Sequence, residues 1–99
     1  MSLHHPDRAE LQIADVLHAL SDPQRLRIVT RLADREEACT CGGFDLEVSK
    51  STLTHHFRVL REAGVIAQRA AGRERLTELR QDDLNARFPG LLKSIAGAP

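Results

Sequence analysis

The stretch from Ser49 to Arg58 concentrates short polar side chains that can donate hydrogen bonds. It contains hydroxyl, imidazole and guanidinium groups, and the next carboxylate along the chain is Glu62. Such groups suit the acceptor edges of base pairs in the major groove of DNA, which is wide enough to admit a helix. We therefore expect DNA contacts from this stretch, through Ser49, Ser51, Thr52, Thr54, His55 and Arg58.

The apolar residues of the same stretch predict the helix that would present these donors. Ser49 or Ser51 can cap its start, because a side-chain oxygen accepts a hydrogen bond from a backbone N–H of the first turn. Gly64 can end it in the left-handed conformation. One face at helical spacing would be buried, and it comprises Leu53, Phe57 and Leu60. An ordinary amphipathic surface helix would show the same spacing, so the flanking sequence has to distinguish the two interpretations.

A β-hairpin is predicted directly after this helix. Val65–Ala70 forms the first strand, Ala71-Gly72-Arg73 the turn, where glycine accepts a positive φ, and Arg75–Leu79 the return strand. A hairpin after a recognition helix is typical of a wing, and guanidinium groups near its tip can meet phosphates or a narrow minor groove. These groups belong to Arg69, Arg73 and Arg75. The alternative is a plain surface hairpin with incidental arginines.

Two helices are predicted before this unit, so the fold class is mostly α with a small β-hairpin, a winged helix-turn-helix. The first helix spans Arg8–Leu20. The second starts with Asp22 as N-cap and Pro23 as its first residue, or with Ser21 as the cap, and runs to Leu32. We expect its arginines to point outward, namely Arg25, Arg27 and Arg31. A short positioning helix would fit within residues 44–47.

The two ends of the chain carry more apolar surface than their short helices need within one molecule. The first helix has two apolar lines, and the last helical segment, Asp82–Ile95, is predicted to kink or split at Phe88-Pro89-Gly90. Small domains often complete their cores by dimerising. We therefore expect a homodimer formed through the first and last helices.

Length and composition bound the class of protein. Ninety-nine residues make a single domain, with residues 1–7 expected to form a flexible arm and residues 97–99 a frayed tail. No segment approaches the roughly 18 apolar residues of a membrane span, so a cytoplasmic protein without a membrane partner is expected. The chain has no phosphate loop and no paired catalytic carboxylates, and it is too short to enclose a substrate, so it is not predicted to be an enzyme.

The charges are balanced overall but unevenly placed. The chain has 14 basic and 14 acidic residues, a net charge of zero, which argues against a general polyanion binder. The segment Ser49–Arg75 contains six basic and two acidic residues. The segment Asp34–Glu47 has the opposite balance, with acidic residues in excess. One local surface is therefore predicted to be basic. A winged-helix protein-interaction module without a DNA target is the alternative, but it would favour an acidic or apolar recognition face.

Cys39 and Cys41 are the only cysteines, and they are two positions apart. A disulfide framework is not expected from such a pair, and in a reducing compartment metal ligation or redox chemistry is the better interpretation. Three hypotheses stay open. Oxidation could disturb the neighbouring helix, the thiolates could bind a thiophilic metal ion or metalloid, or the pair could have no sensory role.

The segments Ala19–Ile28 and Ser49–Gly64 resemble the second helix and the recognition helix of ArsR-type winged-helix repressors, and Gly72-Arg73 falls where that family turns its wing. The resemblance covers roughly residues 9–96. It implies a homodimeric repressor that binds an inverted-repeat operator in double-stranded DNA and is released by a signal. The resemblance carries the family's DNA contacts over to Arg73 and its neighbours on the wing, and to Ser51, Thr52, Thr54, His55 and Arg58. His56 is expected to be a satisfied, partly buried imidazole.

The sensory site is where the resemblance is least complete. Cys39-Thr40-Cys41 is similar to the Cys-x-Cys element of the family's arsenic, cadmium or lead sensors, but it supplies only two ligands. The family's other common site uses His and Asp on the last helix, and this helix has Asp82 and Asp83 without a His. A redox or thiophilic-metal signal is therefore expected, and a zinc-type interfacial site is not.

Overall fold

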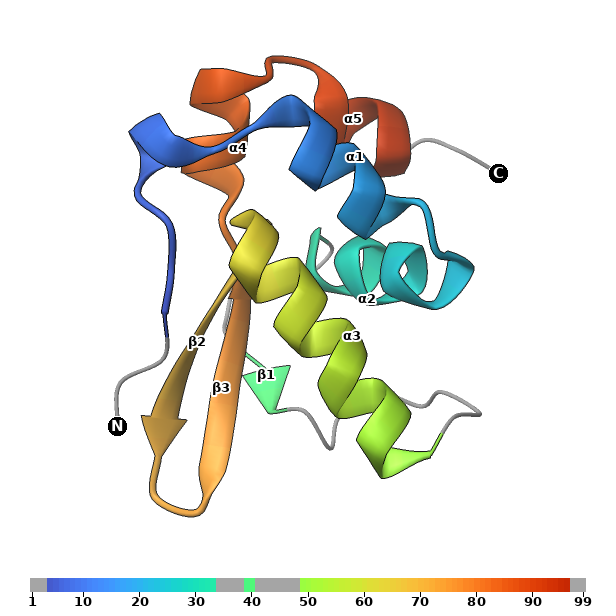
Figure 1. The fold of residues 1–99 in the computed structure, drawn as a ribbon, viewed down its shortest axis with the longest axis vertical. Helices are drawn as coiled ribbons and strands as arrows, with labels where there is room; N and C mark the ends of the chain where they lie inside the picture. Colours follow the sequence, from blue (N-terminus) through green and yellow to red (C-terminus); the bar gives the residue numbers. More distant parts are fainter. Residues whose placement is uncertain (1–3, 34–38, 41–48, 97–99) are drawn as a thin grey trace.

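The computed structural model describes residues 4–33, 39–40 and 49–96. The chain forms a 3-10 turn, five α-helices and three strands within these ranges (Figure 1). In order they are η1 (Arg8–Glu10), α1 (Ile13–Leu20), α2 (Pro23–Ala33), β1 (Cys39–Thr40), α3 (Lys50–Ala63), β2 (Ile66–Ala71), β3 (Glu74–Leu79), α4 (Gln81–Arg87) and α5 (Leu91–Ala96). The predicted mostly helical fold with a small hairpin is confirmed. The expected helix at residues 44–47 and the tail at 97–99 lie outside the described ranges.

The predicted continuous helix over Arg8–Leu20 is wrong. The chain makes only one 3-10 turn at Arg8–Glu10, and α1 starts at Ile13. Leu11 and Gln12 between them are extended, with ψ angles of 131° and 130°. The break lets the Leu11 side chain enter the core, where it is 1% exposed. Burial of a leucine, worth about 2 kcal/mol, outweighs the one or two helical hydrogen bonds that the break removes.

Helix α2 begins as the sequence predicts. Asp22 Oδ1 accepts hydrogen bonds from the backbone N–H groups of Gln24 and Arg25, at 2.8 and 3.2 Å, and Pro23 is the first helical residue. Ser21 is not the cap, because its hydroxyl instead donates to the carbonyl of His18. The aliphatic face of α2 is buried through Ile28, Val29 and Leu32.

Helix α3 also has the predicted ends. The Ser49 hydroxyl accepts from the Thr52 N–H at 3.2 Å, and Gly64 closes the helix with φ of +87°. Phe57 and Leu60 are buried and Leu53 packs against the core, as the apolar spacing predicted. In Figure 1 this helix crosses beneath α1 and α2 and projects its N-terminal end toward the same end of the molecule as the hairpin turn.

The hairpin pairs β2 with β3 in antiparallel register, from Ile66 opposite Leu79 to Ala71 opposite Glu74. Gly72 takes φ of +65° in the turn, as expected for a tight connection. Strand β1 adds to the other edge of β3, giving the order β1-β3-β2. This third strand could not be predicted from the sequence, because two residues are too few to show a period.

The last helical segment splits as predicted, into α4 and α5 around Phe88-Pro89-Gly90. Its apolar residues serve the chain's own core more than expected, since Leu84 and Leu92 are buried and the others pack against the core. Ile13 and Leu17 of α1, in contrast, are 44% and 51% exposed. Within the ranges that the structure describes, no helix is both long and apolar enough to cross a bilayer.

Candidate nucleic-acid interface

The predicted donors of α3 share its exposed surface. The predicted donors from the cap to the middle of α3 are all exposed, and so is Lys50 among them; these donors are Ser49, Ser51, Thr52, Thr54, His55 and Arg58. The buried residues of the same helix, His56, Phe57 and Leu60, face the core. Packing on one side therefore leaves a row of hydroxyl, imidazole and guanidinium groups on the other, which is the arrangement that major-groove contacts require.

The hydroxyls of this row differ in the hydrogen bonds that they make within the protein. The Ser49 hydroxyl caps the helix, donates to Thr52 Oγ1 at 2.9 Å and lies 3.2 Å from Ser51 Oγ. Thr54 donates to the carbonyl of Lys50 at 2.9 Å, which leaves its oxygen able to accept. Ser49 therefore mainly fixes the start of α3, while Ser51 and Thr52 lie at the exposed entry of the helix.

The three hairpin arginines, Arg69, Arg73 and Arg75, are all exposed near the turn, but they do not share one face. Arg75 pairs with Ala70, and Arg69 pairs with Leu76. Residues paired across two strands project to the same face of the hairpin, and successive residues of one strand project to opposite faces. Arg75 therefore shares a face with Ala70 and Gln68, and Arg69 projects from the other face. The Gln68 face is the one next to α3, since Arg61 of α3 hydrogen bonds to Gln68.

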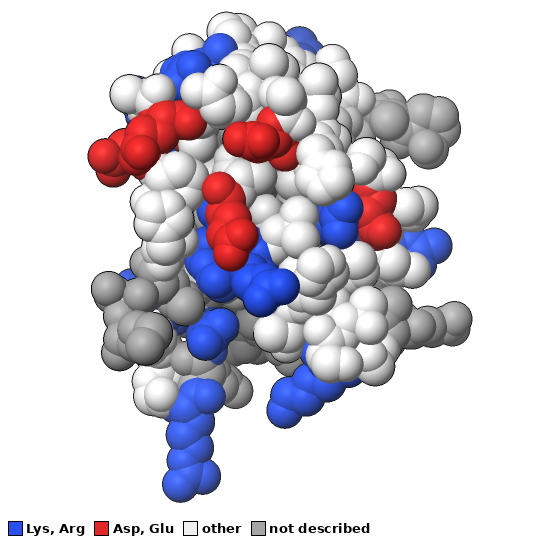
Figure 2. Space-filling model, in the orientation of Figure 1, with Lys and Arg blue, Asp and Glu red and all other residues white. Residues whose placement is uncertain are grey.

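Basic side chains reach furthest at the end of the molecule where α3 begins and the hairpin turns. Figure 2 shows Lys and Arg atoms extending from both of these places, with the visible acidic side chains lying above them. The local basic surface predicted from the sequence is therefore formed by two separate elements at one end of the fold. Such a distribution attracts a polyanion although the net charge is zero.

Arg61, near the C-terminal end of α3, is partly buried. Its Nη1 donates to Gln68 Oε1 at 2.7 Å, and Gln68 Nε2 donates to Thr77 Oγ1 at 3.1 Å. Burial lowers the pKa of the Arg61 guanidinium, and the charge of Arg75 lowers it further. This chain of hydrogen bonds joins α3 to both strands of the hairpin and fixes their relative orientation.

The expectation that Arg25 points outward is wrong. Arg25 is 8% exposed; its Nε donates to the carbonyl of Ala19 at 2.6 Å and its Nη1 lies 3.1 Å from His56 Nδ1. His56 was expected to be a satisfied, partly buried imidazole; it contacts Arg25 and is more deeply buried than expected, at 6% exposed. Arg25 was missed because its partner in α3 is distant in sequence, and only the immediate i, i+3 and i, i+4 neighbours are visible to a periodic pattern.

The His56 ring lies among three other charged or titratable groups. Its Nε2 is 4.0 Å from Asp22 Oδ1, and the ring of His55 is 6.0 Å away between centroids. Burial lowers the pKa of His56; the Asp22 carboxylate raises it, and Arg25 and His55 lower it, with a net decrease. Burial raises the pKa of Asp22, but the N–H groups of Arg25 and Gln24 lower it overall.

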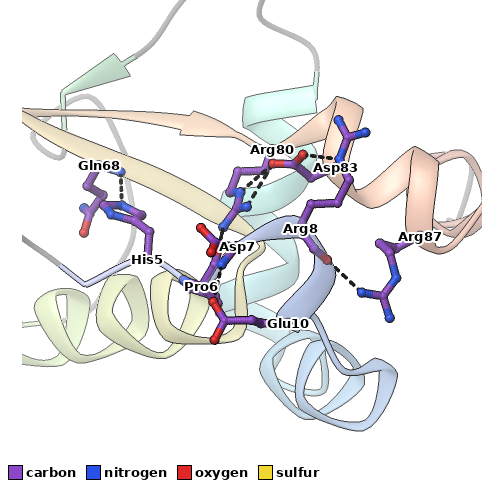
Figure 3. Close-up of polar contacts among 9 residues, drawn as sticks. All are labelled: His5, Pro6, Asp7, Arg8, Glu10, Gln68, Arg80, Asp83 and Arg87. Carbon is purple, nitrogen blue, oxygen red and sulfur yellow. Dashed lines mark hydrogen bonds and ion pairs between the residues drawn. The ribbon is translucent and has the colours of Figure 1, made fainter.

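The N-terminal segment lies along the free edge of β2 (Figures 1 and 3). His5 Nε2 accepts from the backbone N–H of Gln68 at 3.0 Å, and Arg80 Nη1 donates to the carbonyl of Pro6 at 2.7 Å. The sequence suggested a flexible arm over residues 1–7; residues 1–3 are outside the described ranges, while residues 5 and 6 make these contacts. Edge strands need such cover, because their unpaired N–H groups would otherwise pair with other chains.

An ion-pair cluster continues from this segment onto α4 (Figure 3). Asp83 accepts from Arg8 Nε at 2.6 Å and from Arg80 Nε at 2.9 Å, and Arg87 Nη1 donates to the carbonyl of Arg8 at 2.7 Å. Hydrogen bonds from Arg8 lower the pKa of Asp83, and those from Arg80 add to the effect although burial opposes it. Asp83 therefore serves as an ion-pair partner that joins α4 to the N-terminal segment.

Cys39 lies in β1 with its backbone opposite Thr77, and its side chain and all of Cys41 lie outside what the structure describes. Among the described residues, no three His, Cys, Asp or Glu side chains are grouped closely enough to hold a metal ion.

Comparison with known proteins identifies the family. The family model described as "Bacterial regulatory protein, arsR family" matches residues 22–68, which include α2, α3 and the start of β2. The HTH-type transcriptional regulator YceK of Bacillus subtilis is 36% identical over 84 residues, covering 83% of this chain and 84% of that protein. The chain belongs to the ArsR family. Its relatives are transcriptional regulators, and this ArsR-family protein is not an enzyme.

Other relatives agree with this assignment. A transcriptional repressor SmtB homolog of Synechocystis is 40% identical over 68 residues, covering 68% of this chain and 50% of that protein. An ArsR-like transcriptional regulator from Rhodococcus sp. RHA1 has a similar structure, with a TM-score of 0.65 and 26% identity over 82% of this chain and 76% of that one. The winged-helix fold class predicted from the sequence is confirmed.

Proposed function

We propose that this ArsR-family protein is a sequence-specific DNA-binding repressor whose α3 enters the major groove while the hairpin contacts the adjacent backbone. The main support is the exposed row of donors on the N-terminal half of α3, held against the core by Phe57 and Leu60. The recognition face is polar and basic, which favours DNA over the protein-interaction alternative.

The proposed division of labour follows from the chemistry of each element. Side chains of α3, chiefly Thr52, His55 and Arg58, would read base edges. Arg73 and Arg75, on the turn and on the α3 side of the hairpin, would bind phosphates, and these contacts would give most of the affinity and its salt dependence. Arg69 projects from the other hairpin face and would contribute less.

Operator binding would require two copies. Inverted-repeat sites match a twofold dimer whose recognition helices are about one DNA turn, ~34 Å, apart. The exposed Ile13 and Leu17 of α1 are the apolar residues that a second copy would cover, and the partly buried Leu91 and Ile95 of α5 could extend that surface. The proposed dimer therefore retains the first and last helices as its interface.

Cys39 and Cys41 are the proposed sensor, responding either to oxidation or to a thiophilic metal ion or metalloid. The backbone of Cys39 pairs with β3, so a change at this residue is next to the hairpin. Because both hypotheses depend on thiolates, they predict the same loss of response in a Cys39→Ser/Cys41→Ser variant.

A gel-shift assay on DNA from the protein's own promoter tests the function. The protein is titrated under reducing conditions, with peroxide, and with Cd(II), As(III), Ni(II) or Zn(II). Specific retardation of the promoter DNA supports the repressor, and release by peroxide or by one ion identifies the signal. Absence of any preference over an unrelated duplex of equal length would contradict the proposal. A double Cys→Ser variant that responds like the wild type would exclude both sensing hypotheses.

A further inference from the structure

Three helices meet at the buried guanidinium of Arg25. It extends from α2, donates through Nε to the carbonyl of Ala19 in the last turn of α1, and reaches His56 in the middle of α3 through Nη1. His56 directly follows His55, one of the exposed donors proposed to read DNA. The pair therefore connects the core to the centre of the proposed reading face.

The chemistry of this contact fixes the protonation state of His56. A guanidinium group has only donors, so the short Arg25–His56 contact requires a lone pair on His56 Nδ1. The ring proton must then be on Nε2, which faces the Asp22 carboxylate at 4.0 Å. The contact thus exists only while the imidazole is neutral and in the Nε2–H tautomer.

We infer that His56 is a positioning residue for the recognition helix: its unprotonated Nδ1, held by Arg25, fixes the orientation in which α3 meets DNA, and protonation of His56 releases that orientation. The inference rests on the proposed function of α3. His56 does not touch DNA in this arrangement, because its ring is buried, and it acts through the placement of its neighbours on the same helix.

Protonation would oppose this contact directly. A proton on Nδ1 removes the acceptor and places a second cation 3.1 Å from Arg25 Nη1. Three charged or titratable groups face the ring, namely Asp22 at the N-cap of α2, Arg25 of α2 and His55 of α3. Asp22 favours the imidazolium but is already bonded to two N–H groups of its own helix. Since burial and Arg25 together keep the pKa of His56 below 6.5, release is expected only below pH 6.5.

Substitution separates the effect of His56 from that of the exposed histidine beside it. A proton on His56 disrupts the orientation of α3 and lowers the affinity for DNA. His56→Asn keeps His55, so an acid response that this substitution removes belongs to His56.

The test combines DNA binding with imidazole NMR. Promoter DNA affinity is measured by fluorescence anisotropy from pH 8 to pH 5.5 for the wild type, His56→Asn and His56→Leu. Asparagine can place a non-titrating acceptor near the position of Nδ1, while leucine keeps the volume without an acceptor. We expect wild-type affinity to be constant above pH 6.5 and to fall below it, by up to about tenfold per pH unit. His56→Asn should bind with near wild-type affinity at pH 7.5 and lose the acid response.

His56→Leu should bind at least about tenfold more weakly at pH 7.5, equivalent to the loss of one base contact. Arg25→Lys provides a second variant, because an ammonium cannot hold Ala19 and His56 in the same fork geometry, and it should weaken binding similarly. Circular dichroism verifies that each variant is folded. Wild-type affinity in folded His56→Leu, or the same pH profile in the wild type and His56→Asn, would overturn the inference and leave the proposed function standing.

The tautomer is measured on the free protein, so it does not depend on DNA. Long-range ¹H–¹⁵N spectra at pH 7.5 should show His56 as the Nε2–H tautomer, and an Nδ1–H tautomer or an imidazolium would overturn the inference. If the wild type binds no DNA at all, the proposed function fails and the positioning role fails with it. The tautomer would then still establish whether the Arg25 contact exists.

Discussion

Leu11 occupies the space that a side chain on Gly64 would need. A Cβ at Gly64 would collide with Leu11 Cδ2 and lie 3.2 Å from Pro6 Cγ. The extended segment before α1 and the end of α3 therefore fit together only because residue 64 is glycine. This contact places Leu11 and Pro6 against the end of α3.

Replacing Gly64 with alanine should destabilise the protein strongly. The alanine would have to adopt a left-handed backbone conformation, which costs about 1–2 kcal/mol. Its Cβ would also collide with Leu11 in the core, which costs about 1–3 kcal/mol more. We expect the free energy of unfolding to fall by at least about 2 kcal/mol in urea titrations. Gly72→Ala is the matched control, because its φ is also positive but nothing lies within 4 Å of the new Cβ. Equal losses in the two variants would contradict the role of Leu11.

The ends of the helices could be predicted from sequence because they depend on neighbours. Asp22 caps the residues directly after it, Ser49 caps the next turn, and Gly64 closes its own helix. Each interaction spans a few residues, and its geometry follows from the backbone alone. The exposed donors of α3 were predictable for the same reason, since the buried apolar stripe determines which side of the helix remains exposed.

The contacts that join elements could not be predicted in this way. Arg25 was expected in solvent, yet its acceptor is 31 residues away in α3. The backbone N–H of Gln68 donates a hydrogen bond to His5, which is 63 residues away, and nothing near His5 in sequence indicates this contact. The opposite projections of Arg69 and Arg75 required the strand register. These features depend on tertiary placement, which a periodic pattern does not contain.

Asp83 should stabilise the fold in a pH-dependent manner. It accepts from Arg8 and Arg80, and its pKa is below the usual 3.8. The carboxylate therefore stabilises the folded state above pH 3.8, and this contribution is lost as the pH falls through its lower folded value. Asp83→Asn should reduce the free energy of unfolding by about 1 kcal/mol at pH 7, because the pair is partly exposed.

Urea titrations from pH 7 to pH 3 check this prediction, with the exposed neighbour Asp82→Asn as control. The difference between wild type and Asp83→Asn should shrink below pH 3.8, while Asp82→Asn should match the wild type at pH 7. A difference for Asp83→Asn that is unchanged at pH 3 would show that the carboxylate charge is not the cause.

The hairpin arginines should affect DNA binding unequally. Arg75 projects from the face next to α3, and Arg69 projects from the opposite face. Arg75→Ala should weaken binding to specific and unrelated duplexes alike and reduce the salt slope by about 1. Arg69→Ala serves as the control on the same hairpin and should have a smaller effect on both quantities. A larger effect at Arg69 would mean that DNA approaches the other face.

Charge on the exposed part of α1 should prevent self-association. Leu17 is 51% exposed, and Leu17→Glu leaves the described core contacts intact while making burial against a second copy unfavourable. Sedimentation should show the wild type as a dimer and the variant as a folded monomer with much weaker binding to an inverted repeat. A dimeric Leu17→Glu variant would move the interface away from α1.

The most direct test of the central claim compares the base preference of the wild type with that of one variant. Fluorescence anisotropy gives the ratio of affinities for promoter DNA and for a scrambled duplex of equal length and composition. In the wild type this ratio should be large, at least about 10³. In His55→Ala/Arg58→Ala, which removes two donors from the exposed face of α3, it should fall by about tenfold or more, while affinity for the scrambled duplex changes much less. An unchanged ratio in the folded variant would contradict the assignment of base reading to this helix.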